Sequence, residues 1–386
     1  MSQKAEYAES AAGESPGLWA ARAAVTERAV LNRHLRRVWA LPGTRLGMAG
    51  WPPTFRQRLH WNWNYWWQAH LLDCLVDAQL RQPHPGRAST INRVVRGVRF
   101  RNFGKWTNEL NDDISWLGLA LLRAHECEEV PVAKPLTRIT DQLRGEWTDH
   151  AGGGIWWRRG GDFKNVPANG PAAILFARWS EAGGERTDRQ RARSMTEWME
   201  QVLVDPKTGL LWDGLYVTPD GEIRDIVKTV YSYCQGVFLG VCVELARGDT
   251  SGVWVERAER TINAVAAHLA DDDVLRGRGG GDGGLFAGIL ARYLALAAVR
   301  LPGLGSAAGD SAGDVASRLV VASADAAWRN RALARGGPLY GPEWSRPAQE
   351  PRTASGKLVE RDLSVQLSAW MTIEAAAALE RLSSGT

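Results

Sequence analysis

The chain has 386 residues, of which 45% are hydrophobic and 23% are charged, a composition typical of globular proteins and not of disordered or fibrous ones. The formal net charge is +4, and the basic residues are scattered without a Lys/Arg tract, so nucleic acid is not expected as the main partner. No apolar run reaches about 18 residues, so we predict no membrane span.

The N-terminal stretch MSQKAEYAESAAGESPG is polar and lacks the apolar core of a secretion signal. We expect residues 1–17 to be a flexible N-terminus and the protein to be cytoplasmic, or secreted if a leader has been removed. The four cysteines have no metal-type spacing. Cys234 and Cys242 fall on one predicted helix roughly 12 Å apart, too far for a disulfide, so reduced thiols are expected.

Tryptophan is unusually frequent, with 19 residues against 7 Tyr and 7 Phe. Ten of the 19 lie between Trp51 and Trp157. An indole offers a large flat apolar face and one N–H donor, which suits the C–H faces of sugar rings. Packing in a hydrophobic core is the alternative for many of these side chains.

Helical periodicity recurs along the chain, whereas strand-like alternation is scarce. Twelve helical segments are predicted, over residues 18–40, 62–81, 88–98, 111–126, 133–147, 168–182, 187–204, 229–247, 252–270, 284–299, 311–334 and 360–381. Pro-, Gly- and Asn-rich stretches separate them. One β-hairpin is predicted at LWDGLYVTPDGEI, where PDG supplies the turn.

The predicted helices alternate in character. The odd-numbered segments carry charge along one face, as outer helices need, whereas the even-numbered ones are apolar and rich in small residues. Six such pairs indicate an all-α fold, an (α/α)6 barrel with six inner and six outer helices, forming a single domain over residues 18–386. An irregular helical solenoid is the structural alternative.

The loops that lead into the inner helices would gather at one mouth of such a barrel. They are rich in Trp, Asn, Asp and Tyr, a combination typical of a glycan-binding groove. Within one of these loops lie two adjacent carboxylates, Asp112 and Asp113. Aspartate is also favoured at the start of a helix, where it meets free N–H groups, so capping is the alternative explanation for the pair.

Several motifs, in order and spacing, together resemble glycoside hydrolase family 76, the endo-α-1,6-mannanases. They are WWQAHLLDCLVDA (66–78), NDDISW (111–116), GGGIWW (152–157), KNVPANGPAAIL (164–175), TVYSYCQGVFLG (229–240) and DGGLFAGILARYL (282–294), with DLSVQLSAW (362–370) as a weaker extension. The resemblance implies an (α/α)6 barrel, in agreement with the helix count. It also implies that Asp112 is the nucleophile and Asp113 the general acid/base of a retaining mechanism.

The chemistry of such a pair is plausible at a helix start. Retaining glycosidases need two carboxyl groups only about 5–5.5 Å apart, which neighbouring residues can provide. Two close like charges resist simultaneous ionisation, so one carboxyl keeps its proton while the other stays ionised. We therefore expect an acid and a nucleophile to arise from identical side chains.

The remaining candidates are expected to bind substrate. They are Trp61, Asn62, Asn64, Trp66, Trp67, Gln68, Asn111, Trp116, Trp156, Trp157, Lys164, Asn165, Asn169, Tyr231, Tyr233, Gln235 and Asp282. The alternatives are core packing for Trp66 and Trp67, a loop anchor for Trp156 and Trp157, a helix-start signal for Asn169 and a turn for Asp282.

The expected partner is an α-1,6-linked mannan or mannooligosaccharide, and the expected oligomeric state is a monomer. No metal and no cofactor is expected, because the histidines show no paired-ligand spacing and glycoside hydrolysis needs none. Three alternatives stay open: another (α/α)6 glycosidase or a sugar epimerase, a noncatalytic glycan-binding protein, and a transglycosylating enzyme.

Overall fold

A computed structural model describes residues 17–128, 130–304 and 307–383. Residues 1–16 of the predicted flexible N-terminus lie outside the described residues. The inner helices are α4 (Tyr65–Arg81), α6 (Asn111–Glu128), α8 (Val166–Ala182), α10 (Ser232–Ala246), α12 (Phe286–Arg300) and α14 (Leu363–Ser383). The outer helices are α2 (Leu18–His34), α5 (Pro85–Arg101), α7 (Ala133–Gly145), α9 (Asp188–Leu203), α11 (Val253–His268) and α13 (Ala307–Arg329).

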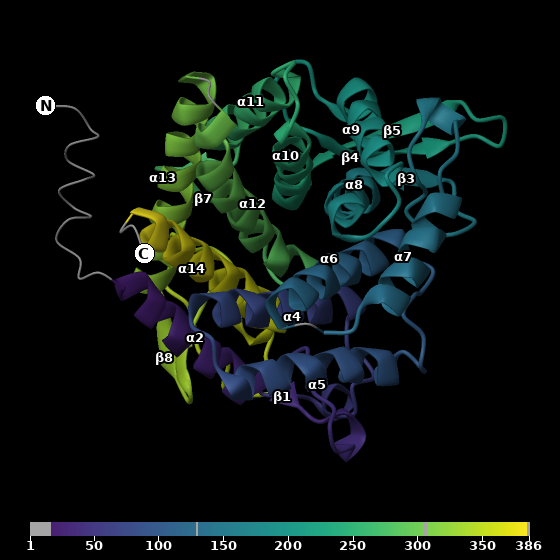
Figure 1. Ribbon diagram of the computed structural model, residues 1–386. Helices are drawn as coiled ribbons and strands as arrows, with labels where there is room; N and C mark the ends of the chain where they lie inside the picture. Colours follow the sequence, from purple (N-terminus) through teal and green to yellow (C-terminus); the bar gives the residue numbers. More distant parts are fainter. Residues whose placement is uncertain (1–16, 129, 305–306, 384–386) are drawn as a thin grey trace, which may run out of the picture.

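The inner helices form a closed ring (Figure 1). Each packs against the next along the chain, and α14 packs against α4, so the first and last inner helices meet. Each outer helix packs on the inner helices beside it. The fold is the predicted (α/α)6 barrel, and the ring closure excludes an open solenoid.

Small residues allow the inner helices to approach closely, as their sequences predicted. A Cβ atom on Gly288 of α12 would lie 2.5 Å from the backbone oxygen of Ser368 on α14. A Cβ atom on Gly236 of α10 would lie 3.0 Å from the Cα atom of Leu290 on α12. The distance between helices therefore requires glycine at the α12–α14 crossing, and a Cβ atom at the α10–α12 crossing would push those two helices slightly apart.

Short strands surround the barrel and account for two of the predicted helix boundaries that were wrong. They pair as β1 (Leu35–Arg36) with β2 (Leu46–Gly47), β3 (Phe163–Asn165) with β4 (Trp212–Val217) and β5 (Ile223–Val230), β6 (Ala270–Asp271) with β7 (Val274–Leu275), and β8 (Ala332–Ala334) with β9 (Gly337–Leu339), all antiparallel. The helix predicted over residues 18–40 ends at His34 because the chain turns back into β2. The helix predicted from residue 229 begins at Ser232 because Val230 pairs with Trp212.

The β4–β5 hairpin confirms the hairpin predicted from the sequence, while β3 was not predicted. The remaining short helices are α3 (Phe55–Arg58) and the 3₁₀ helices η1 (Val38–Ala40), η2 (His150–Gly152), η3 (Gly281–Leu285), η4 (Pro302–Leu304) and η5 (Val359–Arg361). Together β3, β4 and β5 form a wall beside the start of α8, at the mouth of the barrel.

One helical stretch is long and apolar enough to cross a membrane by length and composition, contrary to the sequence count. It spans Gly281–Arg300 and includes α12. Within the barrel α12 packs between α10 and α14, and most of this stretch is buried. Burial in the protein therefore accounts for its apolar character.

Candidate active site

The mouth of the barrel holds a cleft of about 1170 Å³ and, beside it, a smaller hollow of about 540 Å³. The two adjacent aspartates line different hollows. Asp112 lines the large cleft, and Asp113 lines the small one. The pair therefore lies where the two hollows approach each other.

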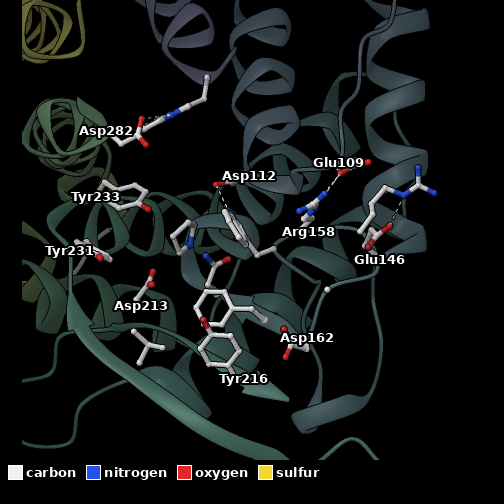
Figure 2. Close-up of a pocket in the computed structure, with 18 of the residues that line it drawn as sticks. Glu109, Asp112, Glu146, Arg158, Asp162, Asp213, Tyr216, Tyr231, Tyr233 and Asp282 are labelled. Atoms are coloured by element: carbon white, nitrogen blue, oxygen red, sulfur yellow. Dashed lines mark hydrogen bonds and ion pairs between the residues drawn. The ribbon is translucent and has the colours of Figure 1, made fainter. Parts of the chain in front are cut away.

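Asp112 lies in the first turn of α6, which begins at Asn111. Its Oδ1 atom accepts a hydrogen bond from the Asp113 backbone N–H at 2.9 Å, and its Oδ2 atom accepts one from the indole N–H of Trp157 at 3.0 Å (Figure 2). Burial raises the pKa of Asp112 to about 6, although both hydrogen bonds favour the ionised form. Asp112 is therefore ionised at neutral pH and protonated in mild acid.

Asp113 is more deeply buried, with 7% of its surface exposed. The side-chain amide of Asn108 donates to its Oδ2 atom at 2.7 Å. Burial and, next, the negative charge of Asp112 hold the pKa of Asp113 well above its usual range. The two neighbouring carboxyls thus have unequal affinities for protons, with Asp113 the one that keeps its proton.

Two further carboxylates face Asp112 across the large cleft (Figure 2). Asp213 projects from β4, and its pKa is raised to about 6 by burial and then by the charge of Asp112. Asp282, in η3, accepts the indole N–H groups of both Trp66 at 3.0 Å and Trp67 at 2.9 Å. Asp282 therefore holds two neighbouring tryptophans of α4 in fixed orientations.

Aromatic rings form one side of the large cleft. The rings of Tyr233 and Phe286 are stacked, with centroids 4.1 Å apart, and Tyr231 packs on Phe286 edge to face at 5.3 Å. Phe163 and Tyr216, which are paired residues of β3 and β4, line the opposite wall. Flat apolar rings together with convergent carboxylates are the usual surroundings of a bound sugar.

Ten of the predicted substrate-binding side chains line one of the two hollows. Those in the large cleft are Trp66, Trp157, Asn165, Tyr231, Tyr233 and Asp282. Those in the small hollow are Trp61, Asn62, Asn64 and Trp67.

Three side chains that were predicted to contact sugar are buried behind the wall of the cleft and hydrogen-bond to backbone groups instead. The side-chain amides of Gln68, Asn169 and Gln235 are fully buried, each at the fourth position of its inner helix. Each accepts the N–H and donates to the C=O of a single residue outside the inner helices, which is Gly47, Ile155 or Leu211 respectively. Gln366 of α14 does the same with Tyr340. These amides shape the mouth, which corrects the expectation that they contact sugar.

Lys164 is also fully buried, and its Nζ atom donates to the carbonyls of Thr148, His150 and Gly153 at 3.0, 2.7 and 2.5 Å. Burial lowers its pKa to about 8. The Lys164 ammonium lies 4.7 Å from the Trp156 ring, so both residues support the glycine-rich loop before β3. The full burial of Lys164 corrects its expected substrate contact, whereas Trp156 is half-buried and lines neither hollow.

Asn111 and Trp116 are likewise structural. The amide of Asn111 donates to the backbone oxygen of Trp156 at 2.9 Å and accepts from Gln142 at 3.1 Å. Trp116 is buried against His70, with ring centroids 4.6 Å apart. Both lie below the cleft surface.

Sequence reasoning missed two polar residues beside the pair, Asp213 and Asn108. Asp213 is an aspartate inside a predicted strand, between apolar residues, where a solvated carboxylate is unusual. Asn108 precedes the helix by three residues and looks like a turn residue. The described residues contain no group of three or more His, Cys, Asp or Glu side chains placed to hold a metal ion.

Comparison with known proteins identifies relatives of the whole barrel. The sequence model of glycosyl hydrolase family 76 matches residues 27–384. The α-1,6-mannanase GH76A of Salegentibacter sp. HEL1_6 is 30% identical, with a TM-score of 0.81 over 94% of this chain and 99% of that one. An inactive variant of that protein, with two consecutive aspartates changed to asparagine, was solved in complex with α-1,6-mannotriose.

Curated relatives are more distant. The mannan endo-1,6-α-mannosidase DCW1 of Candida glabrata is 27% identical over 221 residues, which is 52% of this chain and 49% of that protein. DCW1 of Saccharomyces cerevisiae is 25% identical over 62% of this chain and 59% of that protein. The chain thus spans about half the length of the curated relatives it matches. Since the family model covers nearly all of the barrel, the chain belongs to glycosyl hydrolase family 76.

Proposed function

We propose that the protein is a retaining endo-α-1,6-mannanase that hydrolyses the backbone of an α-1,6-linked mannan. The observation that carries the proposal is the position of two adjacent and differently hydrogen-bonded carboxyls, Asp112 and Asp113, at the junction of two hollows. Family membership and the Salegentibacter α-1,6-mannanase support the choice of substrate. The inactive variant of that enzyme supports a role for two consecutive aspartates.

In the first step Asp113 donates its proton to the glycosidic oxygen while the Asp112 carboxylate attacks the anomeric carbon. The bond to the departing mannose breaks, and a covalent bond between the sugar and Asp112 forms. In the second step the Asp113 carboxylate takes a proton from water, whose oxygen attacks the same carbon and releases Asp112. Each step inverts the anomeric centre, so the α configuration is retained.

The arrangement of the hollows favours cleavage within a chain. A mannan that crosses the pair would place sugars on the Asp112 side in the large cleft and sugars on the Asp113 side in the small hollow. The half-buried ring of Trp66 would contact the first set, and the exposed ring of Trp61 would contact the second. Because sugars would occupy both sides, we expect products of several lengths early in digestion.

The test is digestion of linear α-1,6-mannan with product sizing, alongside Asp112→Asn, and with NMR of the first reducing ends. Short oligosaccharides that first appear as α anomers are expected, with none from the variant. Initial β anomers would reject retention, and release of mannose alone would reject endo cleavage. Binding of mannooligosaccharides without cleavage would reject hydrolysis in favour of a glycan-binding role.

A further inference from the structure

The charges of this chain are unevenly distributed along the sequence. Residues 28–72 and 78–108 contain 14 Arg and Lys residues and no Asp or Glu. The rest of the chain therefore carries 33 of the 47 basic residues and all 43 acidic ones. The small overall charge of +4 conceals a strongly basic portion and an acidic remainder.

The fold brings these basic segments together on the outside of the barrel, around β1 and α5 at the lower edge of Figure 1. The backbone N–H of Arg45 donates to the Arg93 carbonyl at 2.9 Å, and the Arg96 side chain donates to the Gly43 carbonyl at 3.0 Å. The Arg101 side chain donates to the His60 carbonyl at 2.8 Å. We call the side chains of residues 36–45, 55–61 and 93–105 the basic aromatic face.

None of the ten Arg and Lys side chains of this face forms an ion pair with any carboxylate in the described part of the chain. Elsewhere arginines are commonly paired, as in the buried contacts of Arg81 and Arg123 with acidic groups. Repulsion from Arg37, Arg93 and Arg36 contributes, after burial, to a lowered pKa of Arg45. The face is therefore a concentrated positive charge without internal neutralisation.

The same face exposes large apolar side chains. Of the twelve exposed large hydrophobic residues in the described chain, six lie here: Trp39, Leu41, Phe55, Trp61, Phe100 and Phe103. Phe103 is 77% exposed and Phe55 is 71% exposed. Four of these rings form two edge-to-face pairs, Trp39 with Phe100 at a centroid distance of 5.5 Å and Phe55 with Trp61 at 6.4 Å.

Two of these exposed side chains belong to residues with an unusual backbone conformation. Trp39 has φ of 46° and Phe103 has φ of 54°, values that bulky residues rarely adopt. Trp39 is held there by an indole hydrogen bond of 2.6 Å to the Leu59 carbonyl and by the Arg101 guanidinium 5.5 Å from its ring. Strained residues persist where the surrounding structure fixes them, often at sites of interaction.

We propose that the basic aromatic face docks on the surface of an anionic lipid bilayer. Arginine and lysine attract anionic headgroups, while Trp, Phe and Leu insert at the boundary between headgroups and acyl chains. The edge-on ring pairs and the aliphatic Leu41 suit insertion into lipid better than stacking on nucleic-acid bases, which needs open ring faces. Charge complementarity thus selects an anionic membrane as the partner.

Docking would bring the small hollow close to the membrane, because Trp61 belongs both to the face and to the hollow lined by Asp113. A mannan attached to a lipid could then enter the groove from that side. This consequence rests on the proposed function, whereas membrane binding itself does not.

The test is co-sedimentation of the protein with vesicles of phosphatidylcholine alone or with roughly 30 mol% phosphatidylglycerol. Binding only to the anionic vesicles is expected, with release in high salt. Arg37→Glu/Arg58→Glu/Lys105→Glu should weaken binding at least about tenfold. Leu41→Ser/Phe103→Ser should weaken it by a similar factor, because insertion is lost.

The matched control carries the same charge change away from the face: Lys134→Glu/Arg186→Glu/Lys207→Glu, which should bind like the wild type. None of the substituted side chains lines either hollow, so turnover of soluble mannooligosaccharides should not change and reports on folding. Absence of vesicle binding, or equal binding by all variants, would overturn the proposal. The proposal would also be overturned if the protein bound single-stranded DNA as tightly as anionic vesicles and Leu41→Ser/Phe103→Ser did not weaken that binding. Vesicle binding is measured without hydrolysis, so the membrane proposal and the proposed mannanase function can each fail independently.

Discussion

The indole N–H of Trp157 donates to Oδ2 of Asp112 at 3.0 Å, the direct side-chain contribution to keeping this carboxylate ionised. Trp157→Phe keeps an aromatic ring and removes the donor, so the pKa of Asp112 should rise. The acid limb of the kcat/KM profile should move to higher pH, with about tenfold loss near pH 6. Trp156→Phe, at the adjacent position outside both hollows, should leave the limb in place.

The wild-type pH profile follows from the same two groups. Asp112 must be ionised to attack, so with its pKa raised to about 6 activity should fall as the pH drops through about 6. Asp113 must be protonated to donate, and its pKa lies well above its usual range, so the alkaline limb belongs to Asp113. A profile of kcat/KM that stays flat from pH 7 to pH 4 would contradict this assignment.

Asp213→Asn tests the carboxylate that faces Asp112 from β4. Removal of its negative charge should lower the pKa of Asp112 and move the acid limb to lower pH, opposite in direction to Trp157→Phe. Asp225→Asn on β5, paired with Tyr216 outside the cleft, is the matched control. If both variants shift the acid limb of the pH profile equally, the shift reflects the overall charge of the protein and not the position of Asp213 in the cleft.

A substrate with an activated leaving group separates the roles of Asp112 and Asp113. In an aryl α-mannooligoside with a highly acidic phenol, the phenolate can leave without being protonated. The Asp113→Asn variant should therefore cleave the glycosidic bond of that substrate at a rate close to that of the wild type. The turnover rate of Asp112→Asn should be at least about 10³-fold lower than that of the wild type on every substrate. Equal losses for both variants on the activated substrate would exclude the assigned division of labour.

Stability supplies the control for those variants. The raised pKa of Asp112 means that folding disfavours its ionised form, a cost present above its usual pKa and complete above about 6. Asp112→Asn should therefore unfold at the same or a higher temperature at pH 7. A large fall in Tm would show that lost activity reflects lost structure.

The barrel and the position of the aspartate pair could be predicted from the sequence because both depend on local patterns, whereas the proposed roles of the pair came from the family resemblance. The helical period and the alternation of charged and apolar segments indicated twelve helices, and adjacent aspartates at a helix start are visible without a structure. Helix boundaries failed where a strand took over, as at Val230, because pairing with Trp212 is a tertiary contact.

The roles that depend on where a side chain points could not be predicted from the sequence. Gln235 and Tyr233 are two residues apart in one motif, yet the amide faces loop backbone while the ring faces the cleft. Asp213 is distant from the motifs in sequence and meets Asp112 only through the hairpin. The acid-free basic segments are visible in the sequence, but only the packing of α5 against β2 and the residues before it places them on one surface.

The buried amides explain why polar residues recur at the fourth position of inner helices, and Gln235 offers the cleanest test. Gln235→Leu would keep the volume but leave the buried N–H and C=O of Leu211 without the amide that now satisfies both, at 2.8 and 2.9 Å. Unsatisfied buried groups cost about 1–3 kcal/mol each, so the free energy of unfolding in urea should fall by at least about 2 kcal/mol. Gln201→Leu, exposed on α9, should change it by less than about 0.5 kcal/mol. Because β4 carries Asp213 and follows Leu211, the Gln235 variant should also raise KM; an unchanged stability with raised KM would instead place Gln235 in contact with substrate.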